Sequence, residues 1–150
     1  MRSLTVLSLL AFALAAGCSN GDDNANGGLG GTTWTVVAIG GTSAIAASPP
    51  EIAFDVGGTV EGTDGCNRFK GRFRTERDRI ALGDVVTTKI GCDAERSAQA
   101  KAFASALTGA TGWRLTERGE LELSGAALLV ARPGVGPGGT GAVADEDRVR

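Results

Sequence analysis

Apolar and polar side chains alternate through short segments of the chain between Thr33 and Ala131, and glycine separates many of these segments. A period of two is typical of short antiparallel strands that bury one face. Gly57-Gly58 predicts a hairpin turn between the segments 51–56 and 59–62. The other segments with strand character are 34–39, 68–74, 79–82, 85–90, 113–116, 120–123 and 127–131. The alternation therefore predicts a domain built mainly from short strands.

The phase of the alternation predicts which side chains face the core. The faces expected to be buried are Trp34, Val36 and Ala38, then Ile52, Phe54 and Val56, then Phe69, Gly71 and Phe73. The opposite face of the third segment carries four cations, which we call the basic row: Arg68, Lys70, Arg72 and Arg74.

One stretch, about 93–108, has helical periodicity instead. Asp93 is expected to be its N-cap and Gly109 its C′ residue, with Phe103 and Leu107 as the side chains that anchor it to the sheet. The apolar positions recur at spacings of three and four residues, at Ala94, Ala98, Ala102, Phe103, Ala106 and Leu107.

Charge and composition exclude several classes of function. The chain has 17 acidic and 15 basic residues and a net charge of −2, whereas nucleic-acid binders depend on a strong positive footprint. Histidine is absent, which excludes Ser-His-Asp and Cys-His catalysis and histidine-based metal sites. Asp55, Asp64 and Asp93 could supply acid–base chemistry, but each falls at an expected turn or cap. We therefore expect no catalytic residue, metal, cofactor or nucleic-acid partner.

Residues 1–18 have the features of a bacterial export signal. A basic residue precedes an apolar run at 4–14, and small residues lead directly to Cys18. The run is too short to span a bilayer, which requires about 20 residues. We expect cleavage before Cys18 and lipidation of its thiol, which would anchor the protein to the extracytoplasmic side of a cell-envelope membrane, the outer membrane if the cell has one. Cleavage after Ala15 is the alternative, and it would release a soluble secreted protein.

Glycine-rich polar segments flank the predicted strands. The composition of residues 19–31 predicts a flexible tether, and that of residues 133–150 predicts a disordered tail. Both segments have too few apolar side chains to offset the entropy of ordering them. The expected domain is 32–132, and about 100 residues suffice for a single core.

The chain has three cysteines, and lipidation of Cys18 leaves Cys66 and Cys92 as a pair. In an oxidising compartment such a pair favours a disulfide, which would contribute about 3–4 kcal/mol in the chain-entropy model. Free thiols or a redox function are the alternatives, although no histidine or second local cysteine is present to lower the pKa of either thiol.

Five blocks in the expected domain have a specific order and spacing. They are Gly31-Thr32-Thr33-Trp34, Gly65-Cys66-Asn67 followed by Phe69 and Gly71, Thr87-Thr88-x-x-x-Cys92, Phe103-x-x-Ala106-Leu107 and Leu121-x-Leu123. Together they resemble the META domain family, also called HslJ-like. The resemblance implies an α+β fold, in which a curved antiparallel sheet or partly closed barrel of about 7–8 strands packs against one helix. It also implies an envelope protein linked to heat stress and drug tolerance, without an established enzymatic activity or catalytic residues.

Two features are candidates for a binding surface. Asn67 could present its amide to a ligand, but Gly65-Cys66-Asn67 is also suited to a turn that positions Cys66. The basic row could meet anionic lipid headgroups, at about 1 kcal/mol per cation. Alternatively it is solvated, or it pairs across strands with Glu120 and Glu122.

The sequence thus favours a non-enzymatic, monomeric envelope lipoprotein that interacts with another envelope component, such as a protein, under stress. The alternative is a carrier of a small hydrophobic ligand or lipid, held in a cavity lined by Trp34, Phe54 and Trp113. A barrel interior filled by these side chains would favour the interaction module.

Overall fold

The computed structural model describes residues 28–135. The expected signal with Cys18, most of the expected tether and residues 136–150 of the expected tail lie outside this range. Within it the chain forms one helix, α1 (Ala94–Thr108), and nine strands. The strands are β1 (Thr32–Ile39), β2 (Thr42–Ser43), β3 (Glu51–Phe54), β4 (Thr59–Thr63), β5 (Arg68–Glu76), β6 (Arg79–Thr87), β7 (Ala110–Leu115), β8 (Leu121–Gly125) and β9 (Leu129–Pro133).

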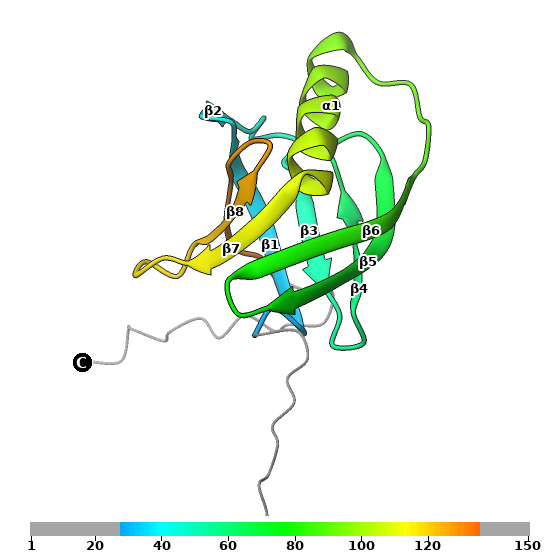
Figure 1. The fold of residues 1–150 in the computed structure, drawn as a ribbon. Coiled ribbons are helices and arrows are strands. Elements are labelled where there is room, and N and C mark those ends of the chain that lie inside the picture. The colour runs from blue at the N-terminus through cyan, green and yellow to red at the C-terminus, as the bar shows by residue number, and fades with distance from the viewer. Residues whose placement is uncertain (1–27, 136–150) are drawn as a thin grey trace, which may run out of the picture.

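Eight of the strands close into an antiparallel barrel (Figure 1). The strand order is β2-β1-β3-β4-β5-β6-β7-β8-β9, and pairing of β1 with β9 closes the barrel, which leaves β2 as an extra edge strand. β6 and β7 pair at a single position, Arg79 with Gly112. Helix α1 stands across one end of the barrel and contacts β6, β1, β8 and β9. The predicted α+β class, with a barrel and one packed helix, is confirmed.

Aromatic side chains join the helix to the barrel core. Phe103 and Leu107 of α1 are each 1% exposed, as their predicted role as anchors requires. The ring of Phe103 lies 5.5 Å from that of Phe69 on β5, and Phe73 makes an edge-on contact with Phe54 at 4.8 Å. Burial of each large apolar side chain contributes about 1.5–3 kcal/mol.

The ends of α1 differ in how well they were predicted. Asp93 is the N-cap, and its carboxylate accepts the backbone N–H of Arg96 at 2.9 Å. Gly109, predicted as the C′ residue, is the C-cap and has φ −90°, so it lacks the left-handed conformation usual for a C′ glycine. A Cβ at this position would lie 2.5 Å from that of Ala126. Glycine is therefore required for close packing of the backbone.

The structure differs from three sequence predictions, at bulges and at a strand that ends early. The pairing of β1 with β9 shifts between Val36 and Ala38, so Ile39, not Ala38, is buried. β3 ends at Phe54, and Val56 is 71% exposed rather than part of the buried face. The predicted strands 79–82 and 85–90 form a single strand, β6, with Asp84 at φ 53°. Alternation alone does not reveal a bulge, because one inserted residue reverses the faces after it.

The folded domain extends past both predicted boundaries. Leu29, within the range predicted to be a flexible tether, is completely buried in the core. The N–H of Gly31 donates to the carbonyl of Phe54 at 2.6 Å. At the other end, the N–H of Gly134 donates to the carbonyl of Thr33 at 2.8 Å. One apolar side chain and main-chain pairing thus order short glycine-rich segments that composition alone assigns to linkers.

Candidate functional site

The connection between β4 and β5 is a tight turn, the cysteine turn, formed by Asp64-Gly65-Cys66-Asn67. Asp64 is 4% exposed, and its carboxylate accepts the N–H groups of Cys66 (2.8 Å) and Asn67 (2.5 Å). Gly65 has φ 90°, a conformation that favours glycine. These local contacts make the turn a rigid support for Cys66.

Asn67 holds the segment that follows β6. Its side-chain oxygen accepts the N–H of Ile90 at 2.6 Å, and the hydroxyl of Thr88 lies 3.4 Å from the same oxygen. The backbone N–H of Arg68 donates to that hydroxyl at 3.1 Å. The amide oxygen of Asn67, a candidate for ligand binding in the sequence, therefore contacts the backbone of this chain.

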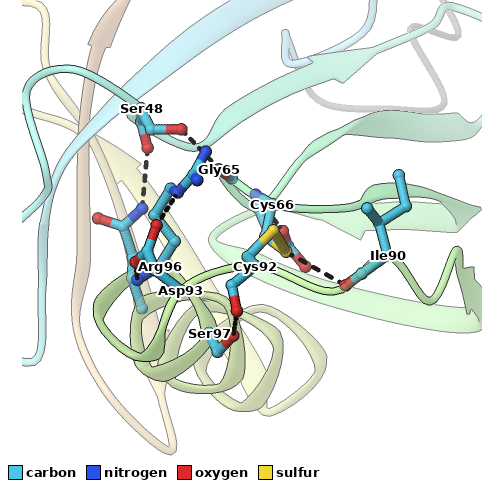
Figure 2. A network of polar contacts seen from close by, with 10 residues as sticks. Ser48, Gly65, Cys66, Ile90, Cys92, Asp93, Arg96 and Ser97 are labelled. Atoms are coloured by element: carbon cyan, nitrogen blue, oxygen red, sulfur yellow. Dashed lines mark hydrogen bonds and ion pairs between the residues drawn. A yellow bond between two sulfur atoms is a disulfide. The ribbon is translucent and has the colours of Figure 1, made fainter.

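A disulfide joins Cys66 to Cys92, with their Cα atoms 6.1 Å apart (Figure 2). It links the cysteine turn to the segment immediately before α1, where the hydroxyl of Ser97 donates to the carbonyl of Cys92 at 3.3 Å. The closed loop spans 26 residues. This arrangement fixes the start of the helix relative to β4 and β5.

Gln99, which sequence reasoning missed, connects the helix to the β2–β3 loop. It is 9% exposed; its side-chain oxygen accepts the N–H of Ile45 (2.7 Å), and its nitrogen donates to the carbonyl of Ser48 (2.9 Å). The hydroxyl of Ser48 in turn donates to the carbonyl of Gly65 at 2.6 Å (Figure 2). A glutamine four residues before Phe103, on the apolar side of the predicted helix, was the available signal.

The basic row lies on the outer face of β5, and all four of its side chains are exposed. Lys70 forms an ion pair with Glu61 across the β4–β5 pairing, at 3.4 Å. Within residues 28–135 the other three members form no ion pair. Of the two alternatives left open, pairing with Glu120 and Glu122 is wrong, because the strand order separates β8 from β5. These two carboxylates pair instead with Arg132 and Arg114.

An open groove of about 540 Å³ crosses the outer face of the barrel. We call it the charged groove. The register places Thr33, Ala53, Glu61, Lys70 and Val86 in one row across five adjacent strands. Glu51 and Arg68 also line it, as does Val135. The acidic groups therefore lie on β3 and β4, and the cations lie on β5.

Apolar surface accompanies these charges. Val86 in the charged groove is 68% exposed, and Val135 is 79% exposed. Apolar side chains that gather within a polar rim mark contact surfaces, and these two side chains line the same groove. The groove thus combines both signs of charge with apolar contact area, which suits a polypeptide better than a purely anionic surface.

The carboxylates considered for catalysis have local structural contacts. Asp55 accepts the N–H of Gly57 at 2.7 Å, and Asp64 and Asp93 accept backbone N–H groups as described above. The backbone N–H of Arg96, followed by its side chain, holds the pKa of Asp93 below its usual 3.8. Among residues 28–135 no three His, Cys, Asp or Glu side chains group as metal ligands would. The same range contains no helix of the length and apolar character needed to cross a membrane.

An eight-stranded antiparallel barrel with one helix across its end, and a groove on its outer face, defines a small α+β barrel domain. Residues 27–132 match the META domain, and the chain belongs to this family. The match includes Leu29 and thus agrees with the extended N-terminal boundary.

Two solved structures share the fold. One is the NMR structure of a protein from Burkholderia xenovorans, which is 21% identical, has a TM-score of 0.60 and matches over 71% of this chain and 83% of that chain. The other, also an NMR structure, is 19% identical with a TM-score of 0.58, over 69% and 89% of the two chains. No curated protein matches the sequence. At these identities the similarity concerns the fold alone.

Proposed function

We propose that this META-domain protein is a non-enzymatic lipoprotein of the cell envelope that binds another envelope protein through the charged groove. The observation that carries the proposal is the position of the groove on the outer face of the barrel, where charges of both signs surround exposed Val86. Complementary charges give such a surface specificity, and apolar contact gives it affinity.

Side chains fill the interior of the barrel, which supports an interaction module rather than a ligand carrier. Trp34 is 6% exposed and Phe54 is 1% exposed, and both belong to the core cluster. Trp113 packs against the same cluster and is partly buried. A carrier would require these side chains to line an internal cavity, and here two of them fill the interior instead.

The envelope location rests on the sequence before the domain. Residues 1–18 end in the cysteine expected to carry lipid, and the glycine-rich segment after it would separate the barrel from the bilayer. Resemblance to the HslJ-like proteins supports a role under heat stress. Intact mass of the mature protein, before and after reduction, tests the anchor: we expect lipid on Cys18 and a gain of two hydrogens for the disulfide. A soluble product beginning at Ala16 would contradict the anchor.

Partner binding is tested by the size of the native complex. The full-length protein, extracted in mild detergent from heat-stressed cells that produce it, should elute on a sizing column ahead of the lipidated monomer. Arg68→Glu with Lys70→Glu should return it to the monomer position, because both cations of the groove are reversed. Lys101→Glu with Arg118→Glu is the matched control, since both residues are exposed and lie outside the groove. Identical elution of the two double variants would contradict binding through the groove.

A further inference from the structure

The chain itself leads into the charged groove. Val135, the last residue that the structure describes, lines the groove together with Thr33 of β1. The hydrogen bond from Gly134 to the Thr33 carbonyl holds the preceding residue against β1. The described part of the chain therefore ends at the β1 end of the groove, immediately before residues 136–150.

The order of charges in this C-terminal segment matches the order of charges along the groove. Residues 136–144 carry no ionisable side chain, and Asp145-Glu146-Asp147 follow them. From β1, the groove first presents Glu51 and Glu61 and then the cations of β5. An uncharged stretch would avoid repulsion from the two glutamates. The charge of the acidic triad is complementary to that of the basic row, where Arg68 and Arg72 have no ion pair within residues 28–135.

The length of the segment is sufficient for this path. Three strand spacings separate β1 from β5 in the barrel, or about 14 Å at 4.7–4.9 Å per spacing. Ten residues from Val135 to Asp145 reach up to about 33 Å when extended. The segment is therefore long enough for the acidic triad to reach the basic row.

We propose that residues 136–147 of the same chain lie in the charged groove, with Asp145-Glu146-Asp147 against Arg68 of the groove and against Arg72, the next unpaired member of the basic row on β5. The inference rests on the proposed function in one respect: the C-terminal segment would compete with the envelope partner for the same surface. A partner that displaces it must carry acidic groups of its own, because it replaces the acidic triad on the basic row. The contact would weaken with salt, since exposed charges are screened within about 10 Å at 0.1 M.

The experiment compares amide NMR spectra of the mature chain, residues 18–150, with Cys18→Ser to keep it water-soluble. The triple variant Asp145→Asn, Glu146→Gln, Asp147→Asn should shift the amide signals of Arg68, Lys70 and Val86, and leave those of α1 unchanged. Addition of salt to the parent chain should shift the same signals in the same direction. The control, Arg148→Gln with Arg150→Gln, makes the segment more negative instead of less negative. It should therefore leave the segment in the groove.

Two results would overturn the proposal. One is a triple variant whose groove signals coincide with those of the parent chain. The other is a shift that disappears on dilution, which would assign the contact to a second copy. Neither measurement includes a partner, so failure here leaves the sizing experiment to decide the proposed function separately. If the proposal holds, the triple variant should also form more of the partner complex than the parent protein does.

Discussion

Polar side chains around the cysteine turn bind backbone groups of their own chain. Asp64 and Asn67 order the turn and the segment after β6, and Gln99 orders the β2–β3 loop. The sequence predicts Asp93 as a cap because the N–H that donates to its carboxylate is only three residues away. It does not reveal the role of Gln99, whose partners Ile45 and Ser48 lie 54 and 51 residues away. Local contacts are readable from sequence, and distant ones require the fold.

Asp93 should make stability depend on pH. Its pKa is lowered from 3.8 in the folded protein, so its contribution to the free energy of unfolding is complete above about pH 4 and is lost as the pH falls toward the lowered pKa. Asp93→Asn retains a capping acceptor without a titrating group. In urea unfolding at pH 7 and pH 3, the variant should lose less stability between the two pH values than the parent. Equal losses would show that the Asp93 contact is absent in solution.

We expect that Gly62, the glycine of β4, cannot be replaced by a residue with a side chain without loss of stability. A Cβ at this position would collide with the carbonyl oxygen of Glu51 on β3, so Gly62→Ala should lower the free energy of unfolding by about 3 kcal/mol. Gly83→Ala is the matched control, because no heavy atom in the described range lies within 4 Å of its Cβ and its φ is not positive. Similar urea midpoints for the two variants would contradict the close approach of β3 and β4.

At the scale of elements, the alternation places most strands, and the helix is predicted with nearly the observed bounds. The errors lie at Val37 and Asp84, where bulges insert a residue, and at Val56, beyond the end of β3. A bulge depends on the partner strand as much as on its own residues. Strand order cannot be predicted from a single sequence either, so the alternation leaves open whether Glu120 and Glu122 pair with the basic row or with other cations.

The disulfide should be the main covalent support of the segment between β6 and α1. Cys66→Ala with Cys92→Ala opens a loop of 26 residues, and the chain-entropy model predicts a loss of about 3–4 kcal/mol in the free energy of unfolding. Reductant should have a similar effect on the parent and none on the double variant. A loss below about 1 kcal/mol would mean that the Asn67 contacts hold the segment without the disulfide.

At the scale of the whole molecule, only part of the candidate surface can be predicted from the sequence. The basic row follows from alternation along a single strand, 68–74. Glu51 and Glu61 come from two other strands, and Val135 enters from the end of the domain. Their meeting depends on the curvature and register of the barrel. The interior filled by Trp34 and Phe54, in contrast, was one of two alternatives that the alternation left open.

Site-specific photocrosslinking in living cells tests the central claim, that the charged groove binds an envelope protein. The full-length protein would carry a photoreactive amino acid in place of either Val86 or Leu115. Val86 lies in the groove and is 68% exposed, and Leu115 lies on β7 and is 51% exposed. After irradiation of heat-stressed cells, position 86 should yield one discrete adduct with a second protein, and position 115 should yield none. Equal adducts at both positions, or none at position 86, would contradict the account.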